Sequence, residues 1–97
     1  MPSTIHVVAK FVAKPGKEDA LKAVLVGLVP PTRRELACYQ YDLLVNAAAP
    51  REFCFLERWD GDRAFDQHLE SAHVKKALAD MESLVDAQPD IRRFTLV

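Results

Sequence analysis

The sequence has little of several features that mark common functions. Only three of its 97 residues are glycine, and they lie too far apart to form a glycine-rich phosphate-binding loop. The longer apolar stretches, such as residues 23–29, fall well short of the roughly 20 residues of a membrane-spanning helix. The formal net charge is −1, which argues against nucleic-acid binding driven by counterion release. We therefore expect neither a nucleic-acid partner nor a membrane partner.

Cysteine is also scarce, and the two that are present, Cys38 and Cys54, are not placed to pair. The register of an expected hairpin sets Cys54 opposite about Leu43 and Cys38 opposite about Trp59. The sulfurs are then about five residues apart along the ladder, or roughly 15 Å. A disulfide needs Cα atoms within about 7 Å, so we expect free thiols and a reducing, cytoplasmic setting.

The composition is that of a globular domain, with 49% hydrophobic and 28% charged residues. At this length we expect a single domain over residues 1–97. Period-two alternation predicts strands, and apolar stripes at helical period predict helices. In chain order these are a strand at 4–14, a helix at 17–29, strands at 38–45 and 52–59, helices at 63–70 and 72–85, and a strand at 91–97.

Two adjacent prolines interrupt the first helical pattern. Pro30 and Pro31 should break or kink that helix, because proline lacks the backbone N–H that a helix interior requires. Thr32 and Glu35 fit a capping box, which predicts one further turn over residues 31–36.

The order of elements is that of the split βαβ arrangement, so the sequence predicts an α+β, ferredoxin-like fold. Its four-stranded antiparallel sheet would carry helices on one face. Apolar residues such as Val8, Val12, Leu44 and Leu56 leave neither face cleanly polar, whereas a face open to water should alternate clearly. We therefore predict a homodimer in which a second copy covers the other face.

His68 is the histidine with the most informative position. It lies in the apolar stripe of the helix at 63–70, beside Phe65 and Leu69, and should face the sheet. A lone histidine on such a face is more often structural than catalytic. His73 follows at i+5 across an expected helix break at Ser71, which is not the i, i+4 spacing of two ligands on one helix. The spacing therefore predicts no metal site.

Glu57 lies beside Trp59 on an otherwise aromatic strand face. Burial of an unpaired carboxylate is costly, so two interpretations stay open. Glu57 is either paired with Lys10, Arg58 or Arg63 (or placed at an edge), or it is a site group beside a flat hydrophobic pocket.

Several short motifs occur in an order that resembles one family. The run VAKPGKEDAL, from Val12 to Leu21, is similar to the opening of the antibiotic biosynthesis monooxygenase (ABM) domains. The family's ordered pattern E-x-W, A, H-L and S-x-H is matched by Glu57-x-Trp59, Ala64-Phe65, His68-Leu69 and Ser71-x-His73. The similarity covers nearly the whole chain.

The resemblance implies a ferredoxin-like homodimer whose sheets pack together as a dimeric α/β barrel, with a pocket between sheet and helices in each subunit. It also implies oxidation of a small quinol or polyphenolic substrate by O₂ with no metal, flavin or haem cofactor. Other members of the family are isomerases or haem-degrading enzymes, and many have no known activity.

The chain departs from the family pattern in two places. Ala37 stands where the family commonly has glycine, and alanine would be strained there at a positive φ. By motif alignment, the tryptophan and histidine of the haem-degrading branch correspond to His68 and Leu78, and no asparagine precedes Asn46. The sequence therefore disfavours haem degradation.

The leading hypothesis is a cofactor-independent monooxygenase in which His68 is the base, since histidine titrates near neutral pH. Glu57 would orient His68 or a substrate hydroxyl, and Arg58 or His73 would steady the developing oxyanion. The aromatic residues expected to bind the substrate ring are Trp59, Phe55, Phe65 and Tyr41.

Two other hypotheses use the same pocket. One is a non-enzymatic dimeric module that binds a small hydrophobic molecule. The other is an isomerase of a small hydroxy-ketone, which would use the same base without O₂.

Overall fold

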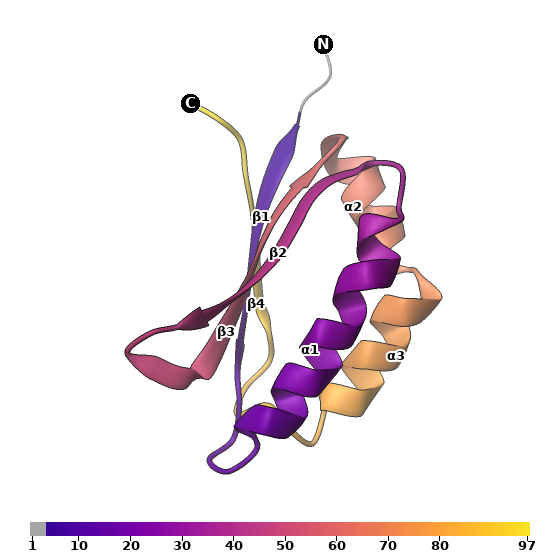
Figure 1. The fold of residues 1–97 in the computed structure, drawn as a ribbon. Helices are drawn as coiled ribbons and strands as arrows, with labels where there is room; N and C mark the ends of the chain where they lie inside the picture. Colours follow the sequence, from indigo (N-terminus) through magenta and orange to yellow (C-terminus); the bar gives the residue numbers. More distant parts are fainter. Residues whose placement is uncertain (1–3) are drawn as a thin grey trace.

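The structure, a computed structural model, describes residues 4–97 and has an α+β, ferredoxin-like fold (Figure 1). The strands form one antiparallel sheet in the order β2-β3-β1-β4, and the helices cover one of its faces. In chain order the elements are β1 (Ile5–Val12), α1 (Glu18–Arg33), β2 (Cys38–Asn46), β3 (Ala49–Trp59), α2 (Gly61–Leu69), α3 (Ala72–Met81) and β4 (Asp90–Phe94). The predicted fold class and element order are confirmed.

The core lies between the helices and the inner face of the sheet. β1 alternates between buried and more exposed residues, and its inward side chains pair across the sheet with those of β3, as in Ala9 opposite Phe55 and Val7 opposite Glu57. This period-two pattern is what a strand with one face on a core requires. From α1, Leu21, Leu25 and Leu28 complete the apolar layer.

Pro30 and Pro31 were expected to break or kink the helix, and a break is wrong, because α1 runs through both prolines to Arg33. Both prolines lie in the last turn, so only the final N–H donations of the helix are lost. Leu28 and Thr32 are buried on the sheet side and hold this turn in place. Thr32 is thus part of α1, and it does not form a capping box with Glu35.

The third helix ends at Met81, four residues before the predicted boundary. The chain after it lies alongside the end of β1, where Lys14 N donates to Leu84 O at 2.9 Å and Asp86 N donates to Val12 O at 2.7 Å. These backbone bonds replace the last helical turn.

The hairpin register differs slightly from the prediction. Cys38 lies opposite Trp59 as expected, but Cys54 lies opposite Leu44, because a bulge shifts the pairing between Cys38 and Gln40. The two cysteines remain far apart along the ladder, and both are free. Burial raises the pKa of the Cys38 thiol to about 11, so this group is not a ready nucleophile.

Ala37 is accommodated without strain, since no residue other than glycine has a positive φ in the described part of the chain. Within residues 4–97, no helix is both long enough and apolar enough to cross a membrane.

The outer face of the sheet, on the side away from the helices, mixes apolar and charged groups. Leu56, Leu44 and Phe94 are exposed there by 39%, 44% and 50%, while Lys10 pairs with Glu52 at 3.0 Å. The residues that share this face in the register include His6, Val8, Lys10, Val12, Asp42, Leu44, Glu52, Cys54, Leu56, Arg58, Arg92 and Phe94.

Candidate functional site

α2 places His68 against the sheet, as its stripe predicts. The histidine is only 3% exposed, and its ring centroid lies 4.5 Å from that of Trp59 and 5.6 Å from those of Tyr41 and Phe65. An aromatic cage of this kind fixes the plane of the imidazole and keeps water from most of its surface.

A contact with β4 holds α2 in position. Arg93 donates to Asp62 at 3.0 Å and to Asp66 at 2.6 Å, and its guanidinium lies 4.8 Å from the centre of the Phe65 ring. Cation–π and ion-pair contacts together tie one turn of α2 to the edge strand. The helix that carries His68 is therefore anchored to the sheet from outside the cavity.

The hydrogen-bond partner of His68 is Glu35, which the sequence analysis did not assign to the site. Glu35 lies in the segment between α1 and β2, and its Oε2 is 2.7 Å from His68 Nδ1 and 2.8 Å from His73 Nε2. Three segments of the chain thus meet at one carboxylate oxygen. Residues 33 and 38 positions apart in sequence carry no spacing signal for such a contact.

Ser71 sets the position of His73. Its hydroxyl donates to the carbonyl of His68 at 2.6 Å and accepts from Val74 N at 3.4 Å, which caps α3. This N-cap satisfies a backbone N–H in the first turn of α3. In the S-x-H motif, Ser71 thus begins α3, and His73 in the first turn of this helix contacts Glu35 Oε2.

The charge state of His68 follows from its surroundings. Burial lowers the pKa of His68, while the hydrogen bond and the charge of Glu35 act in the opposite direction. The histidine is therefore neutral at pH 7. Because a carboxylate only accepts hydrogen bonds, Nδ1 carries the ring proton and Nε2 keeps its lone pair. Among residues 4–97, no second side chain is hydrogen-bonded to this ring.

Glu57 is buried, and it has no counter-ion among residues 4–97. It is 4% exposed, and its Oε1 accepts a hydrogen bond from Trp59 Nε1 at 2.8 Å. Burial raises the pKa of this carboxyl to about 7, although the Trp59 hydrogen bond lowers it. The described residues form no salt bridge to Glu57, since Lys10 pairs with Glu52 instead. Glu57 is therefore a group that can be neutral at physiological pH and donate a proton.

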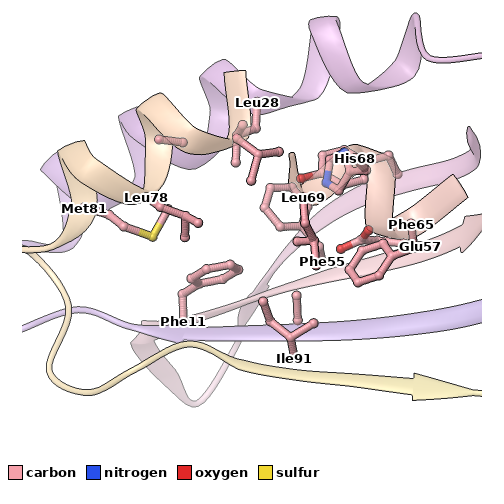
Figure 2. A pocket seen from close by; sticks show the side chains of 14 residues that line it. Phe11, Leu28, Phe55, Glu57, Phe65, His68, Leu69, Leu78, Met81 and Ile91 are labelled. Atoms are coloured by element: carbon pink, nitrogen blue, oxygen red, sulfur yellow. The ribbon is translucent and has the colours of Figure 1, made fainter. Parts of the chain in front are cut away.

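A small cavity lies between the sheet and the helices, with a volume of about 30 Å³ (Figure 2). Glu57 and His68 are its two readily ionisable groups. Burial raises the pKa of Tyr41, which therefore stays a neutral phenol. The lining residues are Ala9, Phe11, Leu28, Tyr41, Phe55, Glu57, Phe65, His68, Leu69, Val74, Ala77, Leu78, Met81 and Ile91.

The cavity has its mouth between α3 and β4. Leu78 on α3 and Ile91 on β4 are 40% and 38% exposed, whereas Phe55 at the floor is 1% exposed. Figure 2 shows Leu78 and Met81 on one side of the space, with Phe11 and Ile91 on the other.

The structure brings most of the predicted site residues together. His68, Glu57, Tyr41, Phe55 and Phe65 all line the cavity, and the last three supply aromatic walls.

Three other predicted residues lie outside the cavity lining. Trp59 does not line the cavity, but its ring packs against that of His68. His73 is separated from the cavity by Glu35 and His68, and it lines a hollow between α1 and α3.

Arg58 lies on the opposite face of the sheet. It is exposed, and its Nε donates to Gln40 Oε1 at 2.8 Å. Because successive residues of a strand point to opposite faces, the inward positions of Glu57 and Trp59 place Arg58 outside. In this structure Arg58 does not reach the cavity, and we assign it no role in steadying an oxyanion.

The ligating atoms of Glu35, His68 and His73 lie within 4.8 Å of one another. Two histidines and a glutamate form a donor set that zinc can use, and sequence spacing did not reveal it. The shared oxygen, however, is at hydrogen-bond distance from both ring nitrogens, at 2.7 and 2.8 Å. The absence of a bound metal stays a prediction.

Comparison with known proteins shows the protein family to which this chain belongs. The model of the antibiotic biosynthesis monooxygenase family matches residues 4–80. The chain therefore belongs to this family, and its function is monooxygenase-like. The resemblance seen in the sequence motifs is confirmed.

Two curated relatives carry related names. "Putative monooxygenase Rv0793" of Mycobacterium tuberculosis is 34% identical over 85 residues, which cover 88% of this chain and 83% of the relative. "Putative monooxygenase YcnE" of Bacillus subtilis is 31% identical over 83 residues, which cover 86% and 87% of the two chains. Among solved structures, PA3566 from Pseudomonas aeruginosa aligns with a TM-score of 0.94 at 29% identity, covering 100% of this chain and 97% of that one.

Proposed function

We propose that the protein is a cofactor-independent monooxygenase that oxidises a small quinol or polyphenolic substrate with O₂. The observation that supports this most is a neutral, caged His68 on the wall of an apolar cavity, with Nε2 left free to take a proton. A general base is most effective when its pKa lies near the working pH.

In the first step, His68 Nε2 removes a proton from a substrate hydroxyl. The resulting anion is electron-rich and transfers one electron to O₂. The radical pair then combines to a peroxide anion at a carbon that still bears hydrogen. This anion takes the proton back from His68 Nε2, which gives a hydroperoxide and restores the neutral base. Loss of water from this hydroperoxide leaves a carbonyl, so one oxygen atom enters the product and the other leaves as water.

Glu57 would act on the substrate oxygen. In its protonated form, below its pKa of about 7, it donates a hydrogen bond that stabilises the developing phenolate. Trp59 holds Oε1 of this carboxyl, which leaves the second oxygen for the substrate. His68 as base and Glu57 as donor are thus two groups whose environments favour opposite proton roles.

The cavity must open for this chemistry. An apolar cavity of about 150 Å³ holds a benzene ring, whereas the present volume of about 30 Å³ suits a water molecule. Leu78 and Ile91 are partly exposed at the mouth, and their side chains are the first that a substrate would displace.

We propose that the active form is a homodimer in the cytoplasm. A two-fold contact over the outer sheet face would cover Leu44, Leu56 and Phe94, which are otherwise exposed. The two free cysteines favour a reducing compartment.

Oxygen uptake with a panel of dihydroxybenzenes, dihydroxynaphthalenes and anthrones tests the proposal. We expect catalytic uptake by the metal-free wild type, and a fall in turnover of about 10²–10⁴-fold in His68→Gln with its melting temperature little changed. Uptake at the wild-type rate in His68→Gln would exclude His68 as the base.

The same panel, with a small hydroxy-ketone added, separates the alternative hypotheses. Trp59 is the only tryptophan and packs against His68, so its fluorescence should report ligand binding. Saturable quenching without oxygen uptake by the wild type would indicate a binding module. Conversion of a hydroxy-ketone without oxygen uptake would indicate an isomerase.

A further inference from the structure

The segment between α1 and β2 places the carboxylate of Glu35 beside Nδ1 of His68. Glu35 and His73 are partly exposed, with side chains open to solvent by 23% and 25%, while the His68 side chain is 4% exposed. The three groups therefore form a path of hydrogen bonds from a buried imidazole to the surface. This path lies on the opposite side of the ring from the free Nε2.

We propose that Glu35 is a positioning residue that locks His68 in the tautomer with a free Nε2, and that His73 anchors Glu35 for this purpose. The inference rests on the proposed function, because it assumes that His68 is the base. It adds two residues, neither of which touches the substrate, to the machinery of proton removal.

The tautomer argument depends on one donor and one acceptor. Glu35 Oε2 can accept but cannot donate while it is ionised, so His68 must present an N–H at Nδ1. Only one ring nitrogen of neutral histidine carries a proton, and Nε2 is then the basic atom. Without Glu35, nothing in the described contacts of His68 would select this tautomer.

Glu35 also supplies charge where it is needed. When Nε2 takes the substrate proton, His68 becomes an imidazolium buried among aromatic rings, and a carboxylate at 2.7 Å offsets that charge. The same logic governs the carboxylate of the Ser-His-Asp triad, where an amide replacement costs about 10⁴-fold because the tautomer is wrong.

His73 explains why a flexible glutamate can fill this role. A partly exposed glutamate loses considerable rotamer freedom when it is held in one position. The Nε2–H of His73 donates to the same oxygen at 2.8 Å, and the Ser71 cap fixes the start of the helix that carries His73. A second donor therefore keeps Oε2 aimed at His68.

Other titratable groups around His68 do not compete for Nδ1. Tyr41 from β2 contacts the ring at its edge, and Glu57 from β3 is held by Trp59. Phe65 from the same helix has no titratable group. Glu35 and His73 are therefore the groups that set the tautomer.

Nitrogen-15 NMR of the imidazole rings tests the positioning role without any substrate. In the wild type we expect protonated Nδ1 and unprotonated Nε2 at His68 at pH 7.5. Glu35→Gln is nearly isosteric, but its amide can donate to Nδ1, so the Nε2–H tautomer should become populated. Glu70→Gln, at an exposed site on the end of α2, is the matched control and should leave His68 unchanged.

The kinetic arm uses a quinol that the wild type oxidises. We expect Glu35→Gln to lower kcat more than tenfold, with KM little changed. The corresponding amide replacement in the Ser-His-Asp triad lowers kcat by about 10⁴-fold. The acid limb of the kcat/KM profile should also move to lower pH, because the variant loses the group that raises the pKa of His68. A purely structural role for Glu35 would not shift that limb.

The anchor is tested by a pair of variants. His73→Gln keeps an N–H donor and should retain the wild-type tautomer at His68, whereas His73→Ala should release Glu35 and mix the tautomers. Lys75→Ala on the same helix is the control. Equal spectra for the Gln and Ala variants would contradict the anchor role of His73.

The positioning proposal is overturned if wild-type His68 carries its proton on Nε2, or if Glu35→Gln keeps both the wild-type tautomer and the wild-type pH profile. Failure of the proposed function is a separate result. In that case wild-type His68 would carry its proton on Nδ1, but the wild type would consume no oxygen with any quinol. Glu35 would then fix the tautomer and orientation of a structural histidine.

Discussion

The indole Nε1 of Trp59 donates a 2.8 Å hydrogen bond to the Glu57 carboxylate two residues earlier on the same strand. Residues i and i+2 of a strand share a face, so the E-x-W motif places a donor beside a carboxyl that forms no salt bridge within the described part of the chain. The hydrogen bond stabilises the ionised form, but burial outweighs it, and the pKa of Glu57 rises to about 7. The motif thus creates a buried acid that titrates in the physiological range.

The first prediction concerns stability and pH. The pKa of Glu57 is about 7 in the folded state, against 4.5 as the ordinary value, so the folded state binds this proton more tightly. Its contribution to stability is fully present below pH 4.5 and is lost as pH rises to about 7. At about 1.4 kcal/mol per pKa unit, the loss amounts to about 3 kcal/mol.

Glu57→Gln should remove this pH dependence, because glutamine stays neutral and can still accept from Trp59. Urea unfolding between pH 4.5 and 8 measures the effect. We expect the variant to gain stability relative to the wild type as pH rises. Parallel curves for the two proteins would show that the pKa of Glu57 is not raised on folding.

The second prediction is that the protein is a homodimer at micromolar concentration, as sedimentation would show. Leu56 lies opposite Val8 and Asp42 on the outer sheet face. Leu56→Lys should give a folded monomer, since a lysine placed at the centre of a two-fold interface must be desolvated. Val26→Lys, at an exposed apolar position on α1, should leave the dimer intact. A wild type that sediments as a monomer would contradict this prediction.

The elements that sequence analysis predicts well are those whose signal is local. Period-two alternation predicts that Glu57 and Trp59 share one face of β3, and the structure shows that this face is the inward one. The stripe of α2 predicts that His68 faces the sheet, as it does. The passage of α1 through Pro30 and Pro31 was not predictable from propensity, because burial of Leu28 and Thr32 decides it. Tertiary packing often overrides local preference in this way.

The contacts of Glu35 have no local signal in the sequence. Its local context suggested a helix cap, yet its carboxylate joins two histidines that follow it by 33 and 38 residues. The two rings come from α2 and α3, and these helices meet at Ser71, whose hydroxyl donates to the carbonyl of His68. Strand alternation places Arg58 on the face opposite Glu57 and Trp59, so Arg58 and Glu57 cannot both point into one pocket.

The third prediction is that the purified protein holds no stoichiometric transition metal. Glu35 Oε2 already accepts from both histidines, and a metal would have to replace both ring protons. Elemental analysis after expression with added zinc measures this, and EDTA should leave oxygen uptake unchanged. One equivalent of zinc that is lost in His73→Gln but kept in Lys75→Ala would reassign the cluster as a metal site.

The last prediction concerns access to the cavity. Leu78 lines the mouth between α3 and β4 and is 40% exposed, so Leu78→Ala should widen the mouth at a small cost in stability. A side-chain change of this size in an apolar pocket alters discrimination by about tenfold or more. We therefore expect kcat/KM for a dihydroxynaphthalene to rise by about that factor relative to a dihydroxybenzene. Val26→Ala removes an exposed side chain that does not line the cavity, and it should leave the ratio unchanged. If the ratio is the same in wild type and Leu78→Ala, the substrate does not enter between α3 and β4, and the mouth must be sought elsewhere around His68.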